Sequence, residues 1–174
     1  MFTKKYFSPI GEIILESDGE SLTGLWFSDS LDARKHSNEF FESDLPIFDQ
    51  TKKWLDMYFS GIKPNFMIPI KLGEMSPFKK QVFEIMSKIP YGKTITYGEI
   101  AKQIARKNGI KKMSAQAVGS AVGSNQICII IPCHRVMGQN DNITGYGGGI
   151  ENKIALLKLE GLDVSKYKMP KNKK

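Results

Sequence analysis

The chain has 174 residues, and 41% of them are hydrophobic, which argues against global disorder. No apolar run reaches membrane-spanning length, and Pro9 and Gly11 interrupt the first residues before a secretory signal could form. With only Cys128 and Cys133, a disulfide framework is not predicted either. We therefore expect a cytoplasmic protein that neither enters a membrane nor relies on disulfides.

The net charge of +7 is divided unevenly along the chain. Residues 1–72 carry 8 Lys and Arg against 11 Asp and Glu, or −3, whereas residues 73–174 carry 17 against 7, or +10. A basic half of this kind favours a polyanionic partner, although a solvated lysine-rich surface gives the same count. Residues 166–174 are predicted to be a disordered basic tail.

The first part of the chain has the pattern of a small sheet followed by a helix. Short β-rich runs, separated by turn signals, predict antiparallel strands over residues 4–8, 12–17 and 22–28. Apolar residues at helical spacing predict a helix over 46–61, and an extended run over 64–72 leads to a linker near Gly73. The chain thus begins with a predicted α/β domain over residues 1–74.

The next part has the signals of three helices. Ser76 before Pro77 predicts the start of a helix that ends near residue 89, and Thr96 with Glu99 forms a capping-box pattern for a second helix that stops at Asn108. A third helix is predicted over residues 114–125. The last two helices make a helix-turn-helix candidate.

The third predicted helix is unusually slim because most of its residues are small. Its Ala and Gly residues favour either close packing against a neighbouring helix or close approach to a nucleic-acid groove. Lys111 and Lys112, directly before it, favour the second alternative because cations near a helix N-terminus attract phosphate.

A β-rich run over residues 127–131 contains Cys128, which has the character of a core residue, and Pro132 ends it directly before Cys133 and His134. The glycines 147–149 fit either a flexible connector or a pocket rim, and a final helix is predicted over 150–161. Glu160, in its last turn, is unfavourable for the helix dipole and needs another reason to be there.

Cys133 is a candidate nucleophile because a thiolate is reactive and His134 could take its proton. Glu160 could orient the imidazole in a Cys-His-Glu relay. Neighbours on an extended strand point to opposite faces, so the relay requires that the chain turn after Pro132 or that a water bridge the two side chains. The only other histidine, His36, is read as a surface residue.

Two further possibilities concern the same segment. The spacing of Cys128, Cys133 and His134 matches no common zinc pattern, so we predict no metal and no cofactor. Arg135 either binds phosphate or pairs internally with an acid.

Several ordered motifs resemble the O6-alkylguanine-DNA alkyltransferase family, also called methylated-DNA-protein-cysteine methyltransferases. They are "PYGKTITYGEIA", "AVGSAVGSN", "IPCHRV", "TGYGGG" and "LLKLEG", and residues 8–27 resemble the more variable N-terminal domain of that family. The resemblance implies an α/β domain with a small antiparallel sheet over residues 1–74, and a mainly α, winged-helix-like domain over residues 75–165. The helix-turn-helix of the second domain would bind the minor groove of double-stranded DNA.

The resemblance also implies an irreversible, single-turnover reaction in which O6-alkylguanine, and by extension O4-alkylthymine, gives its alkyl group to Cys133. His134 would be the base, linked to Cys133 through water, and Glu160 its partner. Tyr97 would assist base flipping and donate toward the base, and Asn125 would support the active-site turn. We expect the protein to act as a monomer.

The remaining implied residues contact DNA or the flipped base. The DNA-binding set is Gln116, Ala117, Ser120, Lys111, Lys112 and Arg135, and the base pocket is Val136, Tyr146 and Gly147. Gln116 departs from the family, which usually has arginine there, and this predicts weaker or more salt-sensitive DNA binding. The zinc site of some relatives is not expected, because the N-terminal half contains no cysteine.

Three other readings stay open. An alkyltransferase-like DNA binder would use the same scaffold without a reactive cysteine, a Cys-His-Glu hydrolase would turn over repeatedly, and a helix-turn-helix regulator would need dimer symmetry. Modification of Cys133 by a methylated oligonucleotide distinguishes the repair protein from all three.

Overall fold

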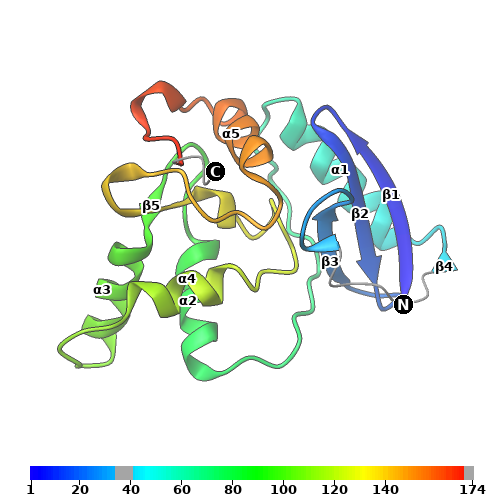
Figure 1. Ribbon diagram of the computed structural model, residues 1–174. Helices are drawn as coiled ribbons and strands as arrows, with labels where there is room; N and C mark the ends of the chain where they lie inside the picture. The colour runs from blue at the N-terminus through cyan, green and yellow to red at the C-terminus, as the bar shows by residue number, and fades with distance from the viewer. Residues whose placement is uncertain (34–40, 171–174) are drawn as a thin grey trace. The chain divides into compact units, whose positions relative to one another are not determined.

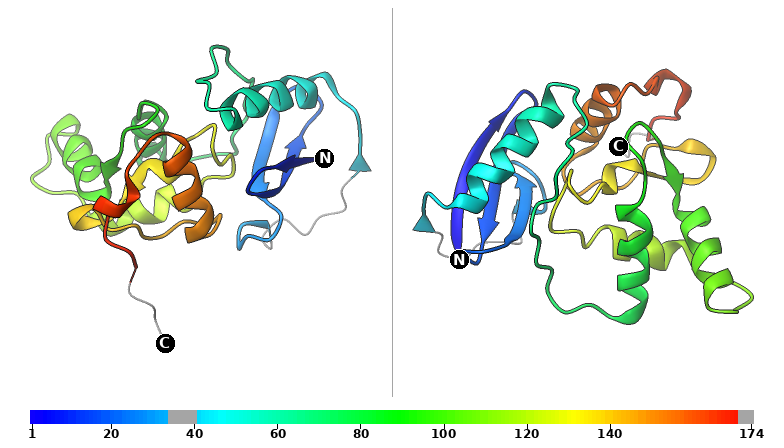
Figure 2. Two further views of the ribbon diagram at one scale, coloured as in Figure 1. Left: turned by 90° about the horizontal axis from the view of Figure 1, so that it is seen from above. Right: turned by 180° about the vertical axis from the view of Figure 1, so that it is seen from behind.

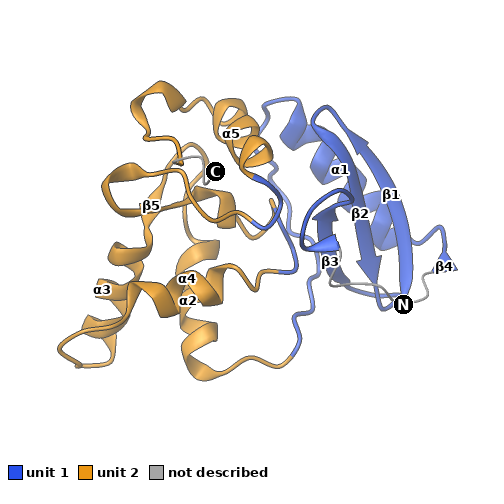
Figure 3. Ribbon diagram, viewed as in Figure 1, with its two compact units in different colours: residues 1–73, 126–128, 147–149 blue, residues 74–125, 129–146, 150–174 orange. Residues whose placement is uncertain are grey.

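The computed structural model describes residues 1–33 and 41–170, which divide into two units (Figures 1 and 3). Unit 1 is built from Met1–Gly73 with two short returning segments, Gln126–Cys128 and Gly147–Gly149. Unit 2 contains Glu74–Asn125, Ile129–Tyr146 and the chain from Ile150 onward. The returning segments come from the part of the sequence assigned above to the second domain. His36 lies outside the described residues.

The sheet of unit 1 has the strand order β3-β2-β1-β4. Its strands are β1 (Phe2–Ser8), β2 (Gly11–Ser17), β3 (Leu22–Phe27) and β4 (Phe41–Glu42). The first three are antiparallel neighbours, as predicted, whereas β4 pairs parallel with β1 and makes the sheet mixed. A two-residue strand has no periodicity of its own, so the sequence pattern did not reveal it.

Helix α1 (Pro46–Phe59) packs against β1 and β2 and covers one face of the sheet (Figure 2). Ile13 and Leu15 alternate inward along β2 and are fully buried, as are Leu55 and Tyr58 of the helix. Burial of these side chains gives unit 1 its own hydrophobic core.

The strand predicted over residues 127–131 is wrong. Only Ile127 pairs with a strand: the Leu25 amide donates to the carbonyl of Gln126 at 2.8 Å, and the Cys128 amide donates to that of Leu25 at 2.9 Å. The chain then turns, and Ile129 has a φ of 68°, which an extended strand does not contain. The run is apolar because it is buried, and Cys128, 1% exposed, is a core residue as expected.

Three helices of unit 2 pack on one another: α2 (Pro77–Ser87), α3 (Tyr97–Lys107) and α4 (Ala115–Val122). The predicted caps are present, since Ser76 accepts from the Lys79 amide and Thr96 forms the capping box with Glu99. Helices α3 and α4 pack closely, since a Cβ on Gly119 of α4 would already be in ordinary van der Waals contact with the Tyr97 ring at 3.8 Å. The helix-turn-helix is therefore formed by α3 and α4.

The rest of unit 2 holds the last helix, two short strands and three short turns. Its elements are β5 (Ile95–Thr96), β6 (Val136–Met137), α5 (Ile150–Leu159) and the 3-10 turns η2 (Cys133–Arg135), η3 (Gln139–Asp141) and η4 (Val164–Lys166). β5 and β6 pair in parallel, and Leu157 of α5 packs with Met137 and Ile143 in a second core.

The predicted disordered tail begins too early. Residues 164–166 form η4, and the Ile143 amide donates to the carbonyl of Lys168 at 2.9 Å. Tyr167 packs against the core of Met137, Ile143 and Leu157. These contacts order the chain beyond residue 166 in spite of its charge, and residues 171–174 lie outside the described part.

Candidate active site

The chain turns directly after Pro132, which is the geometry that the relay requires. Residues Cys133–Arg135 form the 3-10 turn η2, in which the Cys133 amide donates to the Ile131 carbonyl at 2.8 Å and the Val136 amide donates to the Cys133 carbonyl. Cys133 and His134 thus lie on one tight turn and not on opposite faces of a strand.

Asn125 holds this turn from the end of the helix-turn-helix. Its side-chain amide donates to the Ile131 carbonyl at 2.9 Å and to the Cys133 sulfur at 3.1 Å. Cys133 is 6% exposed and Asn125 is 5% exposed. A buried N–H donor thus points at the sulfur and holds this side chain on the turn.

His134 is fully buried, and its Nε2 lies 2.6 Å from Oε1 of Glu160. Burial lowers the pKa of the imidazole below its ordinary value of 6.5, and this outweighs the opposite effect of Glu160. The ring is therefore neutral at pH 7. With the Nε2 hydrogen donated to Glu160, Nδ1 carries the lone pair that can accept a proton.

Glu160 follows the last residue of α5, and its carboxylate accepts hydrogen bonds from three residues. His134 donates to its carboxylate, the Gly92 amide donates to Oε2 at 3.0 Å, and the Arg135 guanidinium donates through Nε at 2.9 Å and Nη2 at 2.9 Å. Burial alone would raise the pKa of Glu160, but the hydrogen bonds of His134 and Arg135 hold it at about 2. These partners explain why an acid follows the last turn of α5.

The expected DNA contact of Arg135 is corrected by this geometry. Arg135 is buried, its Nη1 donates to the Ile89 carbonyl at 2.7 Å, and its other nitrogens face Glu160. Of the two alternatives, phosphate or an internal acid, the structure shows the internal acid. Because His134 is neutral, Arg135 is the cation that balances the Glu160 carboxylate.

The Gly92 amide reaches Glu160 from a backbone conformation that favours glycine. Its φ is +70°, and a Cβ on it would lie 2.9 Å from the Glu160 carbonyl oxygen. We expect Gly92→Ala to lower the free energy of unfolding by about 1–3 kcal/mol, because the left-handed conformation and the contact are both unfavourable for alanine. Urea unfolding midpoints at constant m-value measure the effect.

Gly98→Ala is the matched control for Gly92. Gly98 lies in α3, and a Cβ there would meet only the Thr96 hydroxyl at 3.9 Å, so a neutral or stabilising effect is expected. Equal destabilisation by the two substitutions would contradict the role assigned to Gly92.

Tyr97, the first residue of α3, donates its hydroxyl to the Gly145 carbonyl at 3.3 Å. Burial and the neighbouring Cys133 raise the pKa of this phenol to about 12, so it remains a hydrogen-bond donor at neutral pH.

Lys153 is a residue of this site that the sequence reasoning missed. It is fully buried in α5, where its ammonium donates to the Val136 carbonyl at 2.6 Å and to the Thr144 carbonyl at 2.9 Å. Burial lowers its pKa to about 8, and Cys133 opposes this shift. Lys153 lies four residues before Leu157 and therefore on the apolar face of the predicted helix. A lysine on that face was the sequence signal of a buried cation.

The predicted DNA-binding residues other than Arg135 lie on an accessible surface. Gln116 and Ser120 are exposed on α4, Ala117 is half-buried between them, and Lys111 and Lys112 are exposed in the turn before α4. The opposite side of α4 buries Val118, Ala121 and Val122. The slim helix thus uses one face for packing and leaves the other open.

The predicted base-pocket residues divide between the units. Val136 and Tyr146 are buried in unit 2, whereas Gly147 belongs to unit 1, where a Cβ on it would overlap Asp32 at 2.0 Å from Oδ2. Gly147 is thus a position of close packing rather than a free connector. The described residues contain no group of three His, Cys, Asp or Glu side chains placed to hold a metal ion.

None of the helices within residues 1–33 and 41–170 is both long and apolar enough to cross a membrane. In unit 2, Asn125 links the helix-turn-helix to a buried site that contains Cys133, His134 and Glu160.

Two family descriptions match the chain: the ribonuclease-like domain of 6-O-methylguanine DNA methyltransferase over residues 1–72, and its DNA binding domain over residues 77–162. The chain belongs to the 6-O-methylguanine DNA methyltransferase family.

Relatives match over most of their length. The methylated-DNA--protein-cysteine methyltransferase of Haemophilus influenzae is 39% identical over 156 residues, covering 89% of this chain and 83% of the relative. The protein of the same name from Methanosarcina acetivorans is 39% identical over 162 residues, covering 92% and 99%. The crystal structure of Mycobacterium tuberculosis OGT in complex with DNA superimposes with a TM-score of 0.79 at 36% identity, covering 97% of this chain and 96% of that one.

Proposed function

We propose that this protein repairs DNA by moving the alkyl group of O6-alkylguanine onto its own Cys133, once per molecule. The relatives are named for methyl transfer to a protein cysteine, and one related structure contains DNA. Two contacts of one turn support the assignment to Cys133. The Asn125 amide donates to the Cys133 sulfur, and the neighbouring His134 contacts Glu160.

The residues of the site support the following chemistry. His134 accepts the Cys133 proton at Nδ1 through a water, and Glu160 stabilises the imidazolium that forms. The thiolate attacks the alkyl carbon, a C–S bond forms, and the C–O6 bond breaks with its electron pair going to the guanine. Tyr97, which stays protonated, donates toward the base as this charge develops. The thiol proton finally neutralises the guanine.

The target base must leave the stack, because its O6 atom is not reachable inside a duplex. The exposed face of α4, with Gln116 and Ser120, is the surface we assign to the minor groove, and Lys111 and Lys112 are assigned to phosphates. Val136, Tyr146 and Gly147 stay predictions for the base pocket. We also propose a cytoplasmic location, because the sequence shows no export signal.

The proposal is tested with a duplex that contains O6-methylguanine, followed by peptide mass mapping of the protein. One methyl per protein on Cys133 supports it. Repeated turnover would instead support a Cys-His-Glu enzyme, and binding without modification would support a non-catalytic lesion binder. Either of those results overturns the proposal.

The family that the motifs resemble usually has arginine at the position of Gln116, and Gln116→Arg should strengthen DNA binding and speed transfer. Gln116 is exposed near the start of α4, so the substitution leaves the fold unchanged. We expect roughly fivefold tighter binding, because a charge-assisted hydrogen bond exceeds a neutral one by about 1 kcal/mol. Fluorescence anisotropy and single-turnover rates measure both effects.

Gln50→Arg, on α1, adds the same charge outside the helix-turn-helix and is the control. An equal gain in DNA affinity from Gln50→Arg would show that the added net charge, and not its position on α4, causes the effect. No change in affinity or transfer rate for Gln116→Arg would contradict the role of Gln116.

A further inference from the structure

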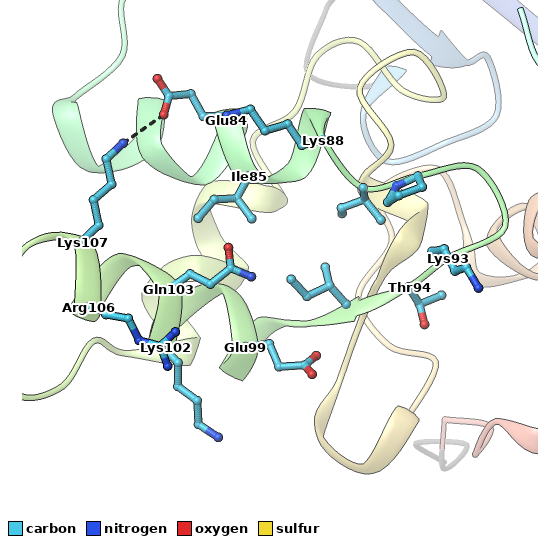
Figure 4. Close-up of a pocket in the computed structure, with 13 residues that line it drawn as sticks. Glu84, Ile85, Lys88, Lys93, Thr94, Glu99, Lys102, Gln103, Arg106 and Lys107 are labelled. Carbon is cyan, nitrogen blue, oxygen red and sulfur yellow. Dashed lines mark hydrogen bonds and ion pairs between the residues drawn. The ribbon is translucent and has the colours of Figure 1, made fainter.

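A basic groove lies between α2, α3 and the segment 88–95 that leads from α2 into β5 (Figure 4). Its volume is about 710 Å³. The floor is apolar and includes Ile85, Ile89 and Ile95, whereas five cations stand around it. These cations are Lys88, Lys93, Lys102, Arg106 and Lys107.

The two acidic residues of the groove offset only part of the charge of its five cations, and Glu99 lies near enough to Lys102 to interact with it. Only Glu84 and Glu99 line it, and Glu99 is engaged in the capping box, where it accepts from the Thr96 amide at 2.7 Å. Glu84 pairs with Lys107 at 3.2 Å and closes one end of the groove (Figure 4). Among described residues, no carboxylate forms an ion pair with the other four cations. A cleft of one charge sign over an apolar floor focuses its field on an anion.

Lys102 and Arg106 together give α3 a row of positive charge, although Arg106 alone also suits the negative end of the helix dipole. They stand four residues apart on the exposed face of α3, a spacing at which like charges repel and destabilise a helix. The side of α3 that carries Ile100 and Ile104 is buried in the core. The repulsion is compensated when a row of phosphates lies along the helix, because each phosphate neutralises one cation and releases a counterion.

The groove is separate from the surface assigned to the damaged DNA. Helix α4 packs against both α2 and α3, but it contributes no residue to the groove, and Lys111 and Lys112 are not among the lining residues either. Phosphates in the groove are therefore not held by the residues that face the lesion.

We propose that this groove binds the phosphate backbone of a second DNA segment while α4 holds the damaged one. The choice of DNA as the polyanion rests on the proposed function. Double-stranded DNA fits the charge because its phosphates form a continuous row of negative charge, and the cations stand on two walls of an open groove. The protein would then bridge two duplexes, or two parts of one long DNA.

The test uses the variant Lys88→Glu/Lys102→Glu/Arg106→Glu, in which all three positions are exposed. Beads that carry one undamaged duplex are incubated with protein and with a second, labelled duplex. The wild type should retain the label and the variant should not. For a duplex of several turns, the slope of log affinity against log salt should become shallower by about 3 in the variant.

The control variant Lys53→Glu/Lys63→Glu/Lys158→Glu changes the net charge equally, at exposed positions outside the groove. It should retain bridging and the wild-type slope. Methyl transfer to Cys133 from a lesion duplex of about 10 base pairs, one helical turn, should proceed at the same rate in all three proteins. This readout also reports that the variants fold.

Bridging by the groove variant at the wild-type level, or equal loss in both variants, overturns the inference. Capture of an acidic polypeptide but not of a second duplex overturns it in favour of a protein partner. Failure of the wild type to transfer methyl to Cys133 counts against the proposed function alone, because bridging is scored on undamaged DNA. If the triple variant does not transfer, Arg106→Glu alone should lower the slope by about 1.

Discussion

Replacement of Cys133 by serine should abolish methyl transfer while leaving DNA binding intact. A serine hydroxyl is a far weaker nucleophile at neutral pH than a cysteine that receives an N–H bond from Asn125 and has His134 beside it. We expect the transfer rate to fall by ~10³-fold or more. Single-turnover assays with an O6-methylguanine duplex measure the rate, and anisotropy with the same duplex measures binding.

Cys128→Ser is the matched control, because Cys128 is the only other thiol of the chain and is also buried. It should retain stoichiometric transfer, with the methyl on Cys133. The fold of the Cys133→Ser variant is checked by its urea midpoint, which should stay near that of the wild type. Transfer by Cys133→Ser, or its loss in Cys128→Ser with an intact fold, would contradict the assignment.

The contact of His134 with Glu160 could be predicted because residues of this segment violate local expectations. Glu160 stands where the helix dipole disfavours an acid, and Cys133 follows a proline that ends an apolar run. Each residue therefore carried a signal that local structure left unexplained, and the contact of His134 with Glu160 supplies the explanation. The capping box at Thr96 and Glu99 was equally readable because both partners are three residues apart.

Other features depend on contacts between residues far apart in sequence. Arg135 had two acceptable partners, phosphate or an acid, and only its position in η2 decides between them. Residues 127–131 have the composition of a strand, but burial in a turn selects the same apolar residues. The basic groove combines three separate segments, so the sequence indicated only the charge of its half of the chain.

Arg135→Leu should destabilise the protein strongly without changing its salt-dependent DNA binding. The substitution leaves the buried carboxylate of Glu160 without its cation, and removal of one partner of a buried ion pair costs about 3–5 kcal/mol. Lys111→Leu is the contrasting variant. Lys111 is exposed and assigned to a phosphate, so its loss should reduce the salt slope by about 1 and leave the unfolding free energy unchanged.

The pH dependence of this destabilisation distinguishes charge from packing. The pKa of Glu160 is about 2 in the folded protein and 4.5 when unperturbed, so its ionisation stabilises the fold above pH 4.5, and this contribution is lost as the pH falls toward 2. Without Arg135 the folded pKa rises toward 4.5. The difference in unfolding free energy between wild type and Arg135→Leu, from urea titrations, should therefore be largest above pH 4.5 and narrow toward pH 2. A difference that stays constant with pH would show that Arg135 contributes packing alone.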